Sequence, residues 1–212
     1  MICGVDEAGR GPILGPLVVC ALAVESDAKL IKLGVRDSKK LTPKRREEFE
    51  PKIRKIARIE LREVPAQEID DRDCSLNKLE AQVFAELLDR ISPEIAYLDA
   101  ADVDEHNFAR MVRSTLKCRP KIVSEHKADD TYPVVSAASI IAKVTRDARM
   151  REIELEIGQP IGSGYVHDEV TMTFVRNWIS DHDCCPPHTR KSWEPAKKLM
   201  SMNAVPKLGS FE

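Results

Sequence analysis

Two adjacent carboxylates, Asp6 and Glu7, directly follow a short apolar run at the start of the chain. A buried carboxylate costs several kcal/mol unless an opposite charge or a metal ion compensates it. Mg²⁺ and Mn²⁺ take oxygen ligands of this kind. The next step, Gly9-Arg10-Gly11, offers open backbone and one guanidinium, which suits a phosphate-bearing ligand. This segment therefore predicts phosphate chemistry on a metal ion.

Two more acids lie at or just past other predicted strands. Asp99 ends the strand predicted for residues 95–98, and Asp129 follows the strand predicted for residues 121–124. Ligands of open α/β sheets gather at strand ends, and converging carboxylates repel one another without cations. With Asp6 and Glu7, these acids could hold two cations about 4 Å apart, the arrangement that stabilises both the attacking and the leaving oxygen of a phosphodiester. On the pattern alone, solvated loop acids explain the residues equally well.

Four rival acids lie close to these positions, namely Asp102, Asp104, Glu105 and Asp130. Asp102 and Asp104 follow Asp99, and helix capping is their simplest explanation, because an acid at a helix start meets the helix dipole. We prefer Asp99 because it directly terminates an apolar strand. The choice between Asp129 and Asp130 stays open at this point.

The elements that must position the acids follow from the hydrophobic pattern. Apolar or alternating runs predict strands at residues 2–5, 17–24, 59–64, 95–98 and 121–124. Helical spacing predicts helices after Thr42 and at residues 77–91, 103–116, 133–157, 169–179 and 192–202. Strands come first and then alternate with helices, which predicts an α/β layer with a mixed sheet. The last two helices form a small appendage after the glycine-rich hinge at residues 162–164.

Bulk composition narrows the class of protein. The chain has 212 residues, 42% of them hydrophobic and 32% charged, which is enough for one large domain with an appendage. The net charge of −2 gives no global sign of nucleic-acid binding, so a basic surface would have to be local. No apolar run reaches the roughly 20 residues of a membrane helix, and no signal peptide is visible, so we expect a cytoplasmic protein. The six cysteines lack a CxxC spacing and are interpreted as buried thiols rather than zinc ligands.

Polar residues elsewhere leave two interpretations open. Ser139, Lys143 and Arg146 recur at helical spacing just after Asp129, either as an exposed stripe or as phosphate contacts. Tyr165 follows the glycine hinge, where a ring could stack on a sugar or base, although a single tyrosine is more often structural.

Together these motifs resemble type 2 ribonuclease H (ribonuclease HII), and most closely its archaeal branch. The matching segments, in chain order, are Gly4-Val5-Asp6-Glu7-Ala8-Gly9-Arg10-Gly11-Pro12, Asp37-Ser38-Lys39-Lys40-Leu41, Tyr97-Leu98-Asp99-Ala100, Lys127-Ala128-Asp129, Ser136-Ala137-Ala138-Ser139-Ile140-Ile141-Ala142-Lys143 and Gly164-Tyr165. The resemblance implies a ribonuclease H-like mixed five-stranded sheet with flanking helices. It also implies a catalytic domain at residues 1–160 and a C-terminal helical segment, 161–212, that completes the substrate groove.

The resemblance further implies an endonuclease that hydrolyses RNA paired to DNA, including single ribonucleotides embedded in duplex DNA. Two Mg²⁺ or Mn²⁺ ions would bind the catalytic acids, which fall on Asp6, Glu7, Asp99 and Asp129. The implied products carry a 5′-phosphate and a 3′-hydroxyl. Expected substrate contacts are Gly9, Arg10, Gly11, Lys39, Ser139, Lys143, Arg146, Tyr165 and Arg190.

Other partners and classes remain to be weighed. We expect a monomer without membrane contact. A sliding clamp is an open alternative, because Val205-Pro206-Lys207-Leu208-Gly209-Ser210-Phe211 matches a clamp-binding pattern only loosely, and a frayed tail is preferred. An ATPase of related fold is disfavoured by the missing phosphate-binding glycine loop. A non-catalytic hybrid-binding protein is disfavoured because carboxylates without cations repel phosphates.

Overall fold

The computed structural model describes residues 1–35 and 41–204. The chain divides into two compact units. The first, here the sheet unit, contains Met1–Ala8, Leu17–Glu63 and Arg72–Arg146. The second, here the helical unit, contains Gly9–Pro16, Val64–Asp71 and Asp147–Glu212. The predicted contact Lys39 and the predicted clamp-binding segment, residues 205–211, lie outside the described residues.

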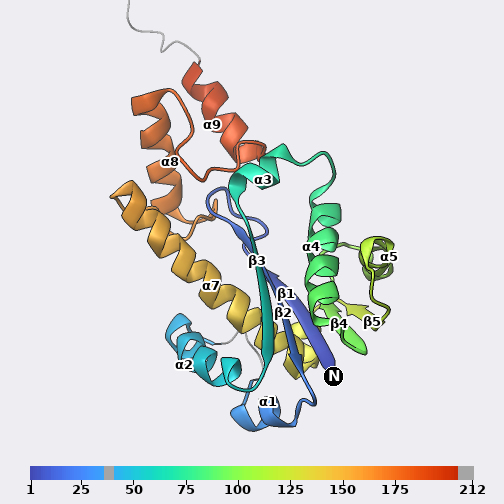
Figure 1. Cartoon of the computed structure of the whole chain (residues 1–212). Helices are drawn as coiled ribbons and strands as arrows, with labels where there is room; N and C mark the ends of the chain where they lie inside the picture. Colours follow the sequence, from blue (N-terminus) through green and yellow to red (C-terminus); the bar gives the residue numbers. More distant parts are fainter. Residues whose placement is uncertain (36–40, 205–212) are drawn as a thin grey trace, which may run out of the picture. The chain divides into compact units, whose positions relative to one another are not determined.

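The sheet unit contains a five-stranded sheet with the order β3-β2-β1-β4-β5 (Figure 1). Its strands are β1 (Ile2–Ala8), β2 (Leu17–Val24), β3 (Arg58–Val64), β4 (Ile95–Asp99) and β5 (Lys121–Glu125). β1 pairs antiparallel with β2 and parallel with β4, and β4 pairs parallel with β5. The mixed five-stranded sheet expected from the sequence is therefore confirmed.

Helices cover both faces of this sheet. The helices of the chain are α1 (Ala28–Leu33), α2 (Pro43–Arg54), α3 (Ala66–Asp71), α4 (Leu76–Ile91), α5 (Glu105–Thr115), α6 (Ala128–Thr131), α7 (Pro133–Ile157), α8 (Glu169–His182) and α9 (Glu194–Ala204). On one face α4 packs on β2 and β1, with α5 beside it. On the other face the start of α7 packs so closely on β1 that a Cβ at Gly4 would lie 2.4 Å from the carbonyl carbon of Val134. All eight residues of β2 are buried, as a strand covered on both faces requires.

The helical unit has a core of its own. Its buried residues are Ile13, Leu14, Met150, Ile153, Ile161, Phe174, Val175, Ile179 and Ala196. They come from the Gly9–Pro16 segment, the second half of α7, and α8 and α9, which pack on each other. The side chain of Asp168 caps α8 by accepting a hydrogen bond of 3.0 Å from the amide of Val170. The C-terminal helical appendage is thus confirmed, whereas the functional domain boundary at residue 160 stays a prediction.

The strand that carries the first two acids is longer than predicted. We expected it at residues 2–5, but β1 runs to Ala8. Its parallel ladder with β4 does stop at Val5, where Leu98 is its partner, whereas its antiparallel ladder with β2 continues to the pair of Ala8 and Val18. Asp6 and Glu7 therefore lie inside the strand, beyond its parallel partner, and not in the loop after it.

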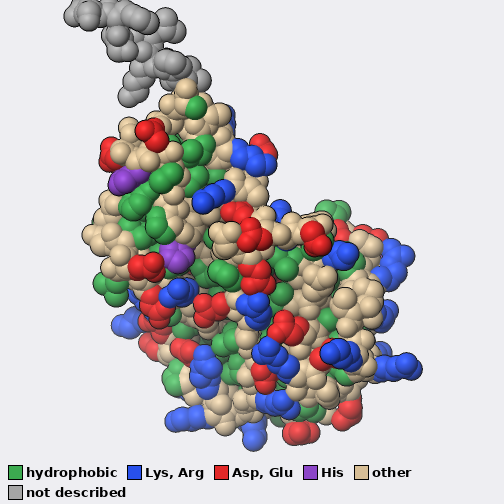
Figure 2. All heavy atoms as spheres, turned by 45° about the horizontal axis from the view of Figure 1, so that its top comes forward, with side chains coloured by type: hydrophobic (Ala, Val, Ile, Leu, Met, Phe, Trp, Pro, Cys, Tyr) green, Lys and Arg blue, Asp and Glu red, His purple; other side chains and the backbone are tan. Residues whose placement is uncertain are grey.

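Other features of the described residues agree with the composition. None of their helices is long and apolar enough to cross a membrane. On the face drawn in Figure 2, Lys and Arg side chains are interspersed with Asp and Glu side chains, in keeping with the net charge of −2. Cys3 and Cys20 are buried thiols, as predicted, but the same prediction is wrong for Cys184, which is exposed, and Cys74, Cys118 and Cys185 are only partly buried.

Candidate active site

Three carboxylates from three elements of the sheet unit converge. Asp6 lies on β1, Asp99 ends β4 and Asp129 lies on α6, and one oxygen of each lies within 4.8 Å of the others. Asp6 and Asp129 are buried, with 4% and 2% of their surface exposed. In the parts of the chain that the structure describes, these residues, here the acid cluster, form the one group of three or more His, Cys, Asp or Glu side chains placed to share a metal ion.

Local hydrogen bonds place Asp129 in the acid cluster. The amide of Ala128 donates to Oδ1 of Asp99 at 3.1 Å, which ties the start of α6 to the end of β4. At the other end of α6, the hydroxyl of Tyr132 donates to Oε1 of Glu125 at 3.0 Å. The sequence predicted no helix here, but Asp129 lies on a one-turn helix, and Asp130 on the same helix is exposed to solvent.

The environment of Asp6 disfavours its ionised form. The pKa of this carboxyl is raised to about 7, chiefly by burial and to a smaller extent by the negative charge of Asp99. The positive charge of Lys143 and hydrogen bonds from Ser139 and from the amide of Glu7 act in the opposite direction. Because these groups offset the burial only in part, an additional cation at the acid cluster would stabilise the ionised form.

Glu7 does not join the acid cluster. Residues directly opposite each other in an antiparallel ladder share one face of the sheet, and neighbours along a strand alternate between faces. Asp6 lies opposite Cys20 and Glu7 lies opposite Val19, and only Asp6 of the two belongs to the group whose carboxylate oxygens lie within 4.8 Å of one another. The structure thus brings together three of the four predicted acids, and a catalytic role for Glu7 stays a prediction.

The rival acids have structural explanations. Asp104 caps α5, because its Oδ1 accepts hydrogen bonds from the amides of His106 and Asn107. Oδ2 of Asp102 accepts a hydrogen bond of 2.7 Å from the side chain of Asn107, and this bond lowers the pKa of Asp102. The capping interpretation is therefore confirmed for Asp104.

The polar face of α7 is buried. Ser139 is 0% exposed and Arg146 is 4% exposed, so the interpretation as an exposed stripe is wrong. The ammonium of Lys143 donates to the hydroxyl of Ser139, and both residues act on Asp6. Their position beside the acid cluster leaves a role in phosphate binding as a prediction.

The predicted sugar-sensing residues lie together in the helical unit. Gly9 has a φ of 86°, which glycine adopts readily. We call Gly9-Arg10-Gly11 the glycine turn. Shortly after it, the amides of Ile13 and Leu14 donate to the carbonyl of Gly164 at 2.9 and 3.2 Å, so this part of the chain is bonded to the residue before Tyr165. Tyr165 itself is half-buried.

Arg190 is placed differently from the expected substrate contact. Its side chain is 0% exposed, and all three kinds of guanidinium nitrogen donate to backbone carbonyls of Gly9, Arg10 and Gly15. Sequence reasoning placed Arg190 among the substrate contacts and missed these bonds to backbone. No local signal could have revealed them, because at least 175 positions separate Arg190 from its partners.

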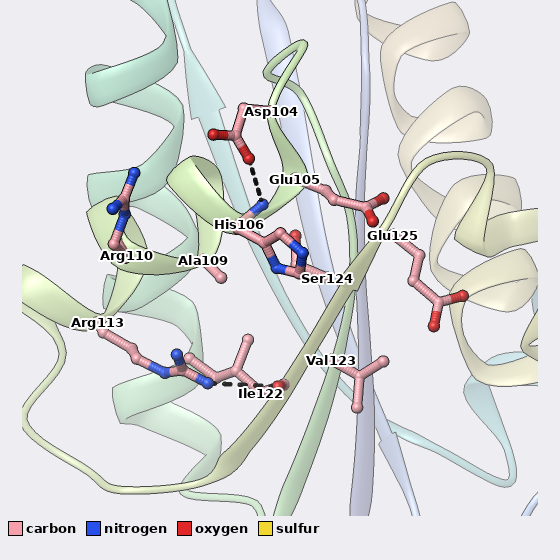
Figure 3. Close-up of a pocket in the computed structure, with 10 residues that line it drawn as sticks. All are labelled: Asp104, Glu105, His106, Ala109, Arg110, Arg113, Ile122, Val123, Ser124 and Glu125. Atoms are coloured by element: carbon pink, nitrogen blue, oxygen red, sulfur yellow. Dashed lines mark hydrogen bonds between the residues drawn. The ribbon is translucent and has the colours of Figure 1, made fainter.

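A separate pocket lies between α5 and β5 in the sheet unit (Figure 3). Its charged lining is mixed and contains Arg110 and Arg113 together with Glu105 and Glu125. Arg113 also donates to the carbonyl of Ile122 at 3.4 Å, on the β5 strand at the end of the sheet. The lining contains no member of the acid cluster, so this pocket is not the candidate active site.

The fold and the acid cluster define the class of protein. A mixed five-stranded sheet of this order, with helices on both faces and carboxylates at the ends of its central strands, is the architecture of the ribonuclease H-like enzymes. The solved ribonuclease H2 from Pyrococcus horikoshii OT3 superposes with a TM-score of 0.89 over 95% of this chain and 98% of that one, at 40% sequence identity.

The particular family follows from the sequence comparisons. The family model of ribonuclease HII matches residues 3–196. The ribonuclease HII of Methanocella arvoryzae is 46% identical over 216 residues, which covers 100% of this chain and 96% of that protein. This chain therefore belongs to the ribonuclease HII family. It is an endoribonuclease that hydrolyses the RNA strand of RNA–DNA hybrids, which removes the ATPase alternative.

A second solved relative carries information on partners. The ribonuclease HII of Archaeoglobus fulgidus, solved in a complex with PCNA, is 39% identical to this chain. It superposes with a TM-score of 0.87 and covers 100% of both chains.

Proposed function

We propose that the acid cluster is a two-cation centre, in which Glu7 joins Asp6, Asp99 and Asp129 as a ligand of Mg²⁺ or Mn²⁺. The observation that carries this proposal is the convergence of three carboxylates from β1, β4 and α6, with oxygens within 4.8 Å of one another. Carboxylate oxygens are the ligands that these hard cations prefer. The raised pKa of Asp6 supports the same conclusion, because burial and the negative charge of Asp99 call for a positive charge at this place.

When bound, two such cations would lower the pKa of an attacking water and stabilise the leaving 3′-oxygen. Residues of the sheet unit hold the ligands for them. The amide of Glu7 donates to Oδ1 of Asp6 at 2.7 Å and the amide of Ala128 donates to Oδ1 of Asp99, so each carboxylate keeps one oxygen engaged by backbone. Ser139 fixes Asp6 from the α7 side. Hydrolysis at this centre leaves a 5′-phosphate and a 3′-hydroxyl.

We propose that substrate recognition uses the glycine turn and Tyr165. The 2′-hydroxyl is the group by which a protein distinguishes RNA from DNA. Nothing in the described structure lies within 4 Å of a Cβ built on Gly11, so its backbone is open to close approach by a ligand. Tyr165 would stack on the neighbouring deoxyribose. Lys143, Arg146 and Lys39 are proposed contacts of the phosphate backbone.

The proposed setting is a monomer in the cytoplasm. Its substrates are RNA–DNA hybrids and DNA duplexes with embedded ribonucleotides. Since the Archaeoglobus fulgidus relative forms a complex with PCNA, a sliding clamp is also a proposed partner of this chain.

Cleavage of a DNA duplex with one embedded ribonucleotide tests the proposed function. We expect a single cut at the ribonucleotide with Mg²⁺ or Mn²⁺, no cut with a chelator, and a loss of several orders of magnitude in Asp6→Asn. End analysis should find a 5′-phosphate and a 3′-hydroxyl. Cleavage in the presence of the chelator, or full activity of Asp6→Asn, contradicts the metal centre. Tight binding of the duplex without any cleavage supports the hybrid-binding alternative instead.

A further inference from the structure

Arg190 is the bulkiest of the fully buried side chains in the described residues. Arginine is almost never fully buried unless it is paired, because its charge loses the solvation of water. The groups around the guanidinium therefore indicate why the helical unit keeps a positive charge in its interior.

The guanidinium is surrounded by backbone of the Gly9–Pro16 segment. Nε donates to the carbonyl of Gly15 at 3.1 Å and Nη1 donates to the carbonyl of Arg10 at 2.7 Å. Nη2 donates to the carbonyl of Gly9. The ring of Trp193 lies 5.1 Å from the guanidinium carbon. Hydrogen bonds from a charged donor are stronger than neutral ones, so one side chain holds two peptide groups of the glycine turn and a third one at Gly15.

These bonds orient the other half of each peptide group. In a trans peptide, the carbonyl and the following N–H point in opposite directions. Because the carbonyls of Gly9 and Arg10 point at Arg190, the N–H groups of Arg10 and Gly11 point away from it. The space beside the Cα of Gly11 is open, since a Cβ built there would meet no described atom within 4 Å.

We infer that Arg190 is a positioning residue, which holds the glycine turn so that the N–H groups of Arg10 and Gly11 face the 2′-hydroxyl oxygen of the ribonucleotide. This inference rests on the proposed function. The inferred positioning role replaces the direct contact between Arg190 and substrate that the sequence suggested. The guanidinium is buried and donates hydrogen bonds to carbonyls in and after the glycine turn.

Two substitutions of Arg190 separate the effect of the planar guanidinium geometry from the effect of the positive charge. Arg190→Lys keeps a positive charge on a flexible stem, but a single ammonium cannot reproduce the planar fork that spans three carbonyls. Arg190→Met keeps most of the stem and removes the charge. The control is Asn203→Ala in the same unit, because the Asn203 amide bonds only α8 and its C-terminal end, with donors to Ile179 and Asp183 at 3.2 and 2.9 Å.

Three quantities are measured at a temperature where circular dichroism finds each variant folded. They are kcat and KM on the duplex with one ribonucleotide, the ratio of affinities for that duplex and for its all-DNA counterpart in Ca²⁺, and the affinity of the protein for Mn²⁺. We expect both Arg190 variants to lose about 30- to 100-fold in kcat/KM, as for several charged hydrogen bonds. Their preference for the ribonucleotide duplex should fall by a similar factor, whereas their affinity for Mn²⁺ should stay within about 2-fold of the wild type. The control variant Asn203→Ala should retain the wild-type kcat/KM and the wild-type preference.

Several results would overturn the inference. These are wild-type kcat/KM in Arg190→Lys, an equal loss of affinity for the ribonucleotide and all-DNA duplexes, or a loss that Asn203→Ala reproduces. If neither Arg190 variant folds, NMR of the wild type decides: the amide signals of Arg10 and Gly11 must shift on binding the ribonucleotide duplex and not its all-DNA counterpart. A wild-type protein that cuts no hybrid would refute the proposed function, whereas wild-type cleavage with an unaffected Arg190→Lys refutes this inference alone.

Discussion

The sheet unit and the helical unit both bury charged side chains, but they compensate them differently. In the sheet unit, Lys143 and two hydrogen bonds offset the burial of Asp6 only in part, so its pKa is raised. In the helical unit, the guanidinium of Arg190 donates to three backbone carbonyls of one short segment. The acid cluster is therefore suited to bind a further cation, whereas the Arg190 centre is complete and serves to hold a backbone shape.

This difference suits the two centres to different proposed roles. A charge that the protein compensates only in part destabilises the fold and favours binding of a ligand with the opposite charge. A charge that fixed carbonyls surround stabilises one conformation and needs no ligand. The proposed chemistry therefore belongs to the sheet unit, and the proposed recognition of the sugar belongs to the helical unit.

The largest expected effect separates Asp99 from its nearest rival. Asp99→Asn keeps the shape of the side chain but removes one negative charge from the acid cluster. We expect cleavage of an RNA–DNA hybrid to fall by about 10³-fold or more, because the cations lose an anionic ligand. The matched control is Asp102→Asn, whose side chain bonds Asn107. It should cut within about 2-fold of the wild type, since it weakens only local hydrogen bonds, among them those from Asn107 and Asn77.

Initial cleavage rates at saturating Mg²⁺ measure both variants, and thermal melting verifies that each is folded. An Asp102→Asn variant as inactive as Asp99→Asn would place the rival acid in the chemistry.

Smaller effects are expected from substitutions of two glycines, one in each unit. Gly4 is tightly packed in the sheet unit, whereas Gly11 is open in the helical unit. A Cβ at Gly4 would lie 2.4 to 2.5 Å from the backbone of Val134 and Val135, so Gly4→Ala should destabilise the protein by about 2–3 kcal/mol. A Cβ at Gly11 meets nothing in the described chain within 4 Å, and its φ lies outside the left-handed region. Gly11→Ala should therefore change the unfolding free energy by less than about 0.5 kcal/mol, yet lower kcat/KM on the single-ribonucleotide duplex about 10-fold by obstructing the substrate.

Chemical denaturation and steady-state kinetics test this pair together. An unchanged kcat/KM in Gly11→Ala would mean that substrate does not approach the open side of the glycine turn, and the proposed sensing of the 2′-hydroxyl would lose its support.

How far the sequence predicts each centre depends on the range of its interactions. The acid cluster was predictable because Asp99 and Asp129 follow local hydrophobic strands, and α7 was predicted with the bounds that it has, Pro133–Ile157. The extension of β1 beyond Val5 was missed because it depends on pairing with β2. The one-turn helix α6 is too short to show a periodic pattern.

The contacts of Arg190, in contrast, could not be predicted from the sequence. They join the two ends of the chain, and a guanidinium in the interior looks the same in the sequence as one on the surface. Only the tertiary structure brings its donors to the carbonyls of the glycine turn.

The smallest expected effect is a difference in how pH acts on the two units. The pKa of Asp6 is raised to about 7 in the folded protein, so between pH of about 4 and 7 the folded state binds more protons than the unfolded state. The metal-free protein should therefore lose stability as the pH rises through this window. Hydrogen bonds from the hydroxyl and amide of Ser163 lower the pKa of Asp168 to about 2. The stabilisation of the folded state by the ionised Asp168 should be present above pH of about 4 and should be lost as the pH falls toward 2.

The variants Asp6→Asn and Asp168→Asn isolate the two contributions. At each pH, the unfolding free energy of the variant is compared with that of the wild type, so the contributions of all other titrating groups cancel. Urea denaturation at a series of pH values should find Asp6→Asn gaining on the wild type as the pH rises from about 4 to 7, and saturating Mn²⁺ should reduce that gain by stabilising the wild type at high pH. Asp168→Asn should cost about 1 kcal/mol at pH 7, as for the loss of a helix cap, and less near pH 2. If Asp6→Asn were instead less stable than the metal-free wild type at pH 7, the carboxylate would already be compensated within the fold. The acid cluster would then resemble the Arg190 centre, and the contrast between the two units would fail.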